Sequence, residues 1–316
     1  MTTPPTGTTL RRSSTNITSV ETIGLFIYYN SMKKMIARAA LLALACVFAA
    51  PCFCGEWTEH EKSLFDESLQ IRLESRKVDG LRAALDWIEK KQEEFFSSIL
   101  NDGSVSQEAL LALENNFAIE RYHFLWEIDD KSKETNDCVL SQYKKVVAWN
   151  AAHPESERNP LYSLSAYELA NAAMPLMKYS QKISIGLEEK KFYDAMIRRD
   201  FQSGFLNINA GLWYAFAPAF GGGSDAKAAE CFSKAAKIGP TDYEKFFGFV
   251  YLSQIDWKRG DAAAWEKNLR AADALLPQNV YTNFVRRVNK AGADIFEYAD
   301  DKGKVLKKME KQYGKK

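Results

Sequence analysis

From Trp57 onward, the apolar residues of this chain recur at spacings of three and four, which is the period of an amphipathic helix. No stretch in that region alternates apolar and polar residues as a half-buried strand would. With only 17 Gly and 9 Pro among 316 residues, long helices are rarely interrupted. The sequence therefore predicts an all-α fold, either a bundle or a solenoid of antiparallel helical hairpins.

Capping and breaking residues place the helix boundaries. Ser106 is a good N-cap for a helix that begins at Gln107, with Glu108 in its first turn. Leu64, Leu69 and Leu73 mark the first helix. The other predicted helices are 81–100, 107–130, 139–152, 165–180 and 187–220, followed by shorter ones between 225 and 312.

The segment 32–54 has the layout of a bacterial export signal. Lys33 and Lys34 precede an uncharged apolar run over 39–50, and small residues and cysteines follow. Such a signal normally begins at the initiator Met, so we expect residues 1–31 to be a mis-annotated or disordered extension. The alternative is an uncleaved anchor helix, although Pro51 and Gly55 interrupt a span that is barely long enough. The mature protein is then a single helical repeat domain, 55–316.

Three of the five cysteines lie within this leader, at Cys46, Cys52 and Cys54. Cys46 follows Leu44-Ala45 and is the candidate for lipidation, while plain cleavage is an equally open alternative. Removing residues 1–54 takes five of the 42 basic and one of the 41 acidic residues, so 37 and 40 remain. The body has a net charge of −3, which gives no reason to expect nucleic-acid binding.

A degenerate repeat is present in the C-terminal half. Ala228, Phe232, Ala235 and Pro240 have the small-aromatic-small-proline spacing of the second helix of a tetratricopeptide repeat. Leu269, Ala272 and Pro277 repeat this pattern 37 residues later. Gly260-Asp261 marks the hairpin turn of the second unit. Trp265 departs from the pattern, because a small residue is expected there.

Two stretches of the sequence resemble a known family. Gly211-Leu212-Trp213-Tyr214-Ala215-Phe216-Ala217, with Gly221-Gly222-Gly223-Ser224-Asp225 and the first repeat helix, is similar to the T-component family associated with TRAP-type solute transporters. The stretch 283–293 resembles that family's final helices. The resemblance implies a periplasmic protein, often tethered by lipid, that binds the extracytoplasmic solute-binding subunit. It further implies a homo-oligomer, a trimer, and delivery of a small hydrophobic ligand.

The segment 210–220 carries four aromatic residues, Trp213, Tyr214, Phe216 and Phe220, and is apolar on every side. It is either a buried central helix or, in part, the lining of a ligand groove or an interface. Pro218 should bend or end the helix. The glycine loop 221–223 is not followed by a phosphate-binding Lys, so Ser224 or Asp225 is better interpreted as an N-cap.

Residues that could perform catalysis are few. Glu120 and His123 share a helix face, but no third ligand is nearby in sequence, and neither Cys138 nor Cys231 has a neighbouring base. We find no P-loop, zinc spacing or nucleophile elbow. We therefore expect a non-enzymatic binding and scaffolding component of a TRAP-type uptake system, without a cofactor or metal. The alternative is a repeat-type adaptor in envelope or lipoprotein assembly.

Overall fold

The computed structural model describes residues 55–99 and 103–314, and within them it contains thirteen α-helices and no strand. The all-α prediction is thereby confirmed. The predictions for 1–31, for the export signal 32–54 and for Cys46 lie outside the described residues. None of the described helices is both long enough and apolar enough for a bilayer crossing.

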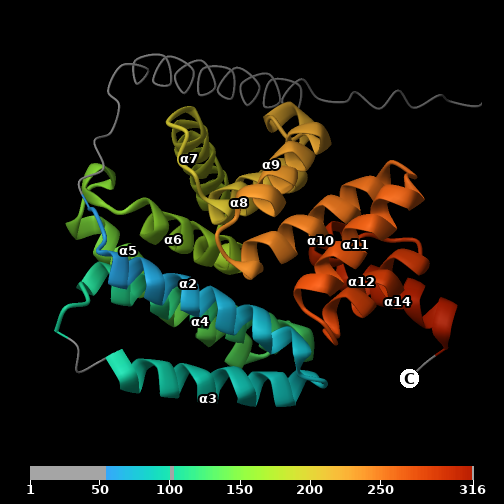
Figure 1. Cartoon of the computed structure of the whole chain (residues 1–316), viewed down its shortest axis with the longest axis horizontal. Helices are drawn as coiled ribbons and strands as arrows, with labels where there is room; N and C mark the ends of the chain where they lie inside the picture. The colour runs from blue at the N-terminus through green and yellow to red at the C-terminus, as the bar shows by residue number, and fades with distance from the viewer. Residues whose placement is uncertain (1–54, 100–102, 315–316) are drawn as a thin grey trace, which may run out of the picture. The chain divides into compact units, whose positions relative to one another are not determined.

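Figure 1 labels all of the helices except α13, and their bounds follow. They are α2 (Glu59–Glu74), α3 (Leu81–Ile99), α4 (Gln107–Ile128), α5 (Lys133–Ala152), α6 (Pro160–Ala173), α7 (Tyr179–Arg198), α8 (Gly204–Phe216), α9 (Asp225–Ile238), α10 (Asp242–Lys258), α11 (Ala262–Leu275), α12 (Tyr281–Lys290), α13 (Ile295–Asp300) and α14 (Lys302–Tyr313). Four 3-10 turns join them, η1 (Ser75–Lys77), η2 (Glu155–Glu157), η3 (Met174–Leu176) and η4 (Ala219–Gly221).

The predicted cap of α4 is confirmed, because Ser106 Oγ accepts a hydrogen bond of 3.2 Å from the Ala109 amide. Several other predicted boundaries are wrong. The helix predicted over 139–152 already begins at Lys133, after the cap Ser132. The helix predicted over 165–180 ends at Ala173, since Pro175 offers no amide hydrogen and restricts the residue before it. The helix predicted over 187–220 is two helices, which are separated at Asp200 (φ 54°) and restarted by the cap Ser203.

The repeat residues lie on two neighbouring helical hairpins. Figure 1 shows α8, α9, α10 and α11 as successive neighbours in two hairpins. Ala228, Phe232 and Ala235 on α9, and Leu269 and Ala272 on α11, are fully buried. Pro240 and Pro277 lie in the exposed segments that follow these helices, and Gly260 (φ 76°) makes the turn between α10 and α11.

Gly211 determines how closely α8 and α9, the first hairpin, can pack against each other. A Cβ at Gly211 on α8 would lie 2.7 Å from Phe232 Cδ1 on α9, which is too close for two carbon atoms. The glycine therefore allows the Phe232 ring to lie directly on the backbone of the neighbouring helix. Phe232 also stacks near Phe296, with ring centroids 6.2 Å apart, so it links the hairpin to α13.

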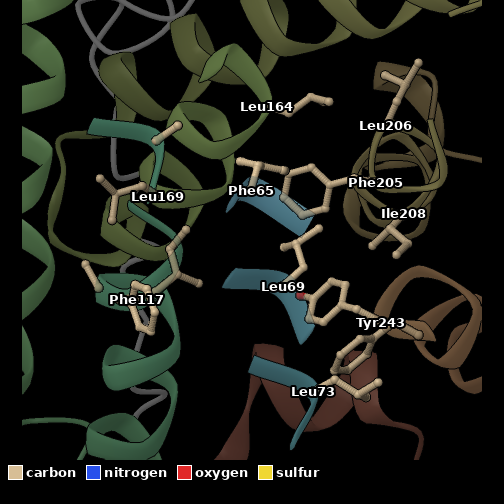
Figure 2. Close-up of a cluster of buried hydrophobic side chains, with 14 of the residues drawn as sticks. Phe65, Leu69, Leu73, Phe117, Leu164, Leu169, Phe205, Leu206, Ile208 and Tyr243 are labelled. Carbon is tan, nitrogen blue, oxygen red and sulfur yellow. The ribbon is translucent and has the colours of Figure 1, made fainter. Parts of the chain in front are cut away.

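Helix α2 carries the other half of the same hydrophobic core. Figure 2 shows Phe65, Leu69 and Leu73 following one another along this helix, with Phe205 of α8 and Tyr243 of α10 opposite them. The Phe65 and Phe205 rings meet edge to face, with centroids 5.5 Å apart. Packing between α2 and the repeat hairpins therefore holds the N-terminal helices against the C-terminal ones.

Helices α13 and α14 dock on the end of α4. Lys302 Nζ donates to the carbonyl oxygens of Trp126 (2.6 Å) and Glu127 (3.0 Å), and it lies 4.5 Å from the Trp126 ring centroid. The Tyr298 hydroxyl donates to Glu127 Oε2 at 2.7 Å. Lys302, one of the C-terminal lysines, is thus hydrogen-bonded to the rest of the fold and does not belong to a frayed, solvated tail.

Candidate functional site

The four aromatic residues predicted as a ligand or interface cluster lie at the end of α8 and in the loop after it. Their side chains point into different environments. Tyr214 is buried, Trp213 is half-buried, Phe216 is 49% exposed and Phe220 is 96% exposed. The segment is therefore neither wholly buried nor wholly exposed, because the core contacts end where the helix ends.

Tyr214 anchors the end of α8 to α7. Its hydroxyl donates a hydrogen bond of 3.1 Å to Asp194 Oδ1, and the other oxygen of Asp194 accepts from Lys190 at 2.6 Å. Burial, with the nearby Asp194 carboxylate, raises the pKa of Tyr214 to about 12. The phenol therefore stays protonated and serves as a structural donor across the α7–α8 contact.

Trp213 covers the same contact from the solvent side. Its Nε1 donates to the Gly186 carbonyl oxygen at 2.9 Å, and Lys190 Nζ lies 5.6 Å from the ring centroid. The indole N–H, the only hydrogen-bond donor of the Trp213 side chain, is thus already used by the α7 backbone. It is thus fixed in place, and only part of the ring remains available to another molecule.

The glycine loop is a rigid turn. The Gly223 amide donates to the Pro218 carbonyl at 3.1 Å, and the Ser224 amide donates to the Tyr214 carbonyl at 2.9 Å. A Cβ at Gly223 would overlap the Ala217 carbonyl oxygen, so only glycine fits. Ser224 is the N-cap of α9, as predicted, with its Oγ accepting from the Lys227 amide at 3.3 Å.

This rigid turn presents Phe220 to solvent. The phenyl ring is on η4, which begins at Ala219 and is closed by the hydrogen bonds to the Pro218 carbonyl. Phe216, one turn away at the end of α8, rests an edge against Phe296 with centroids 5.7 Å apart. Of the exposed large apolar side chains among the described residues, that of Phe220 has the greatest exposed fraction.

Helix α7 has a second exposed apolar strip. Tyr179, Ile183 and Leu187 follow one another at four-residue spacing and are all exposed. Their helix contacts the glycine loop, since a Cβ at Gly222 would lie 3.4 Å from Lys190 Cε. We refer to these three residues, together with the exposed rings of Phe216 and Phe220, as the α7–α8 apolar surface, a set of residues defined by their exposure.

Glu120 and His123 belong to an ion network that links α2, η1, α4 and α6. The Glu120 carboxyl is fully buried, and Arg76 Nη2 lies 2.8 Å from its Oε1 while Arg72 Nε lies 3.5 Å from its Oε2. His123 Nδ1 is farther, at 3.7 Å. Arg72 also holds Glu168 of α6 at 2.7 Å. Sequence reasoning missed this network, since its members are up to 96 residues apart.

No metal site or activated thiol emerges from the described residues. Among residues 55–99 and 103–314, no three His, Cys, Asp or Glu side chains gather where they could hold a metal ion. Burial raises the pKa of the Cys231 thiol to about 12 and also raises that of Cys138. Both thiols therefore stay protonated at neutral pH, which makes them poor nucleophiles.

Trp265, the residue that departs from the repeat pattern, makes a hydrogen bond and lines a pocket in the structure. Its Nε1 donates to Asn289 Oδ1 at 2.9 Å, and the large ring stands beside the α10–α11 turn. There it lines a shallow pocket of about 250 Å³ with Trp257, Gly260, Ala262, Asn289 and Lys290. Asn289 is fully hydrogen-bonded to Gln254 and Ala293, so the pocket has little unused polar capacity.

No protein-family model, curated protein or solved structure matches this chain. The T-component resemblance therefore rests on the residues quoted for it. Of those residues, Gly211, Phe232 and the glycine loop have clear structural roles in the first hairpin.

Proposed function

We propose that this chain is a non-enzymatic, exported scaffolding component of a TRAP-type solute uptake system. It binds the extracytoplasmic solute-binding subunit through the α7–α8 apolar surface. The observation that carries the proposal is Phe220, held 96% exposed on a turn that hydrogen bonds fix in place. A rigid aromatic side chain loses little conformational entropy when a partner covers it, which is typical of residues that dominate binding energy.

The surroundings of Phe220 support a protein partner. Phe216 adds a half-exposed ring, and the strip on α7 adds Tyr179, Ile183 and Leu187. Exposed apolar patches rimmed by charged residues are characteristic of interaction surfaces, and Lys190 and Asp194 supply charges beside this one. The family resemblance names the partner, and the helical hairpins provide a stiff support for the surface.

Co-sedimentation of the full chain with the solute-binding subunit of the neighbouring transporter tests the proposal. We expect a complex at micromolar concentration, and we expect Phe220→Ser to weaken it by about tenfold or more without lowering the melting temperature. Leu81→Ser, which changes an exposed leucine on α3, is the matched control and should bind normally.

Two results would count against this function. If the unaltered chain does not sediment with the subunit, the transporter assignment is wrong. If the chain binds but Phe220→Ser binds equally well, the partner uses a different surface. The sedimentation of the chain alone, measured in the same run, separates self-association from binding of the subunit.

A further inference from the structure

Two tryptophans, Trp257 of α10 and Trp265 of α11, line the shallow pocket at the turn of the second hairpin. Both are half-buried, so part of each side chain is exposed to solvent. Figure 1 shows α12 beside this hairpin, and α12 supplies Asn289 and Lys290 to the same pocket. Three helices thus enclose a hollow of about 250 Å³ whose walls are mainly aromatic.

A buried polar network holds the Trp265 ring in place. Its Nε1 donates to Asn289 Oδ1 at 2.9 Å, and Gln254 Nε2 donates to the same oxygen at 3.2 Å. Asn289 Nδ2 donates back to Gln254 Oε1 at 2.8 Å, and both amide side chains are buried. Satisfied buried networks of this kind are rigid. The Trp265 wall is therefore oriented before a ligand arrives, which lowers the entropy lost on binding.

Small residues keep the pocket open at the turn. Gly260 has a φ of 76°, and no atom lies within 4 Å of the point that a Cβ would occupy. Ala262 lines the pocket with a single methyl group and leaves space that a larger side chain would take. Asp261, between them, is the N-cap of α11, and its Oδ1 accepts from the Ala264 amide at 2.9 Å. Its carboxylate is thus engaged at the start of the helix.

The polar groups that remain unused in the pocket are hydrogen-bond donors. Both acceptor sites of Asn289 Oδ1 are occupied, by Trp265 and Gln254, so no lining side chain offers a free acceptor. Lys290 is the one ionisable side chain that lines the pocket, and it has no ion pair within the described ranges. The indole N–H of Trp257 likewise has no partner there. The pocket therefore favours an anionic acceptor over a cation.

The size of the pocket limits the ligand to one ring. Its volume of about 250 Å³ is below the roughly 300–1,000 Å³ of pockets that hold drug-sized molecules. Flat aromatic groups pack well against indoles, either offset-stacked or edge to face. A sugar would need several polar side chains to bind its hydroxyl groups, and the pocket has few to offer. A single aromatic ring with one negative charge matches both the walls and the unused donors.

We propose that the pocket of Trp257 and Trp265 binds a small aromatic carboxylate. The ring of the ligand lies against the two indoles, and its carboxylate accepts from Lys290 Nζ. The pocket is built from α10, α11 and α12 and shares no residue with the α7–α8 apolar surface. This site is therefore independent of the transporter partner proposed above.

NMR titration of the full chain with phenylacetate tests the site through the indole N–H signals of the tryptophans. We expect saturable shifts of the Trp257 and Trp265 signals, with a Kd of about 1 mM for one ring and one charge. Trp257→Phe and Trp265→Phe each remove one signal and so assign the two. Phenylacetamide has nearly the same shape without the charge and should bind about three- to fivefold more weakly.

Matched variants locate the ligand. Ala262→Leu fills the pocket from an exposed position and should weaken phenylacetate binding by about tenfold or more. Ala263→Leu makes the same change at an exposed position that does not line the pocket, and it should bind normally. Lys290→Gln should weaken phenylacetate binding by about three- to fivefold and leave phenylacetamide binding unchanged. Lys267→Gln, which alters an exposed lysine of α11 outside the pocket, should change neither.

Three outcomes would overturn the site. The first is that phenylacetate shifts neither the Trp257 nor the Trp265 signal. The second is that Ala262→Leu binds as well as the unaltered chain, which would place the ligand elsewhere. The third is equal affinity for phenylacetate and phenylacetamide, which would mean that no donor recognises the carboxylate. Circular dichroism establishes that Ala262→Leu is folded, and Lys290→Gln tests the site through an exposed side chain.

Discussion

Glu120 illustrates how a residue with two possible roles is fixed by its neighbours. Burial alone would raise the pKa of its carboxyl, but the nearby Arg76, His123 and Arg72 together lower it to about 2. The carboxylate also accepts from the Ser75 hydroxyl at 2.8 Å. These contacts with Arg72, Ser75 and Arg76 join α2 and η1 to α4.

Glu120→Gln should destabilise the fold at neutral pH by about 3–5 kcal/mol, because it leaves the buried Arg72 and the half-buried Arg76 without their shared counter-charge. Denaturant unfolding measures the change. Glu114→Gln, which breaks the exposed pair with Lys145, is the control and should cost less than about 1 kcal/mol.

The loss of unfolding free energy caused by Glu120→Gln should depend on pH in a defined direction. The pKa of Glu120 is lowered on folding from 4.5 to about 2. Its contribution to stability is therefore fully present above about pH 4.5 and is lost as the pH falls towards 2. The difference between the parent chain and Glu120→Gln should shrink through that range. A constant difference would mean that the carboxylate charge is not what stabilises the network.

At the scale of elements, the α8–α9 hairpin depends on one pairing of a small residue with a large one. Gly211 has no side chain where Phe232 needs space, and Phe232 fills the space that an alanine would otherwise leave empty. The repeat pattern identified Phe232 as a core residue from its spacing. The need for glycine at 211 follows only from the distance between the two helices.

A double-mutant cycle at these positions should show strong coupling. Gly211→Ala should cost about 1–3 kcal/mol through overlap with the ring, and Phe232→Ala about 3–5 kcal/mol through the cavity that it leaves. The double variant should lose less than the sum by about 1 kcal/mol or more, because the truncated ring makes room for the new methyl group. Thermal or urea unfolding of the three variants gives the coupling energy.

Gly186 is the matched control for this cycle. It also lies within a helix, but the nearest atom to a Cβ there is Trp213 Nε1 at 4.0 Å. Gly186→Ala should therefore be neutral or should stabilise α7 by up to about 1 kcal/mol, as alanine does in a helix where space allows. If Gly186→Ala lost as much stability as Gly211→Ala, the close approach of α8 and α9 would not be the cause of the loss in Gly211→Ala.

At the scale of the whole described chain, Lys302 and Tyr298 connect the C-terminal helices to α4 in the N-terminal half. They bind the last turn of α4 across more than 170 residues of sequence. Lys302 satisfies carbonyl oxygens at a helix C-terminus, where cations are favoured. A small second core of Val288, Ala293, Tyr298, Val305 and Met309 supports this docking.

Lys302→Met should release α14 from α4 without unfolding the rest of the protein. Because charged hydrogen bonds contribute about 1.5–3 kcal/mol, amide exchange in α14 should speed up by about tenfold or more, with α3 unchanged. Hydrogen-exchange mass spectrometry measures both helices at once. Lys307→Met, which alters an exposed lysine of the same helix, should leave exchange as it is. Equal effects of the two substitutions would contradict the docking role of Lys302.

Local chemistry accounts for most of what the sequence predicted correctly. Helix periodicity gives the all-α class, Ser106 and Ser224 cap the helices as expected, and the spacing of Phe232 and Leu269 marks two buried repeat positions. These features depend on residues within a few turns of one another. The wrong boundaries near Pro175 and Asp200 arose where apolar periodicity continued through a break in the backbone.

The sequence by itself determined the fold class, the spacing of the buried repeat residues and the ends of helices such as α3 and α4, because hydrogen bonds and side-chain period act over short distances. Only the tertiary structure decided that Glu120 joins an arginine network, that Phe220 stands in solvent while Tyr214 is buried, and that Trp257 and Trp265 line one pocket. Each of these depends on which helices meet. Burial and charge pairing are set by neighbours that are distant in sequence, so no local pattern encodes them.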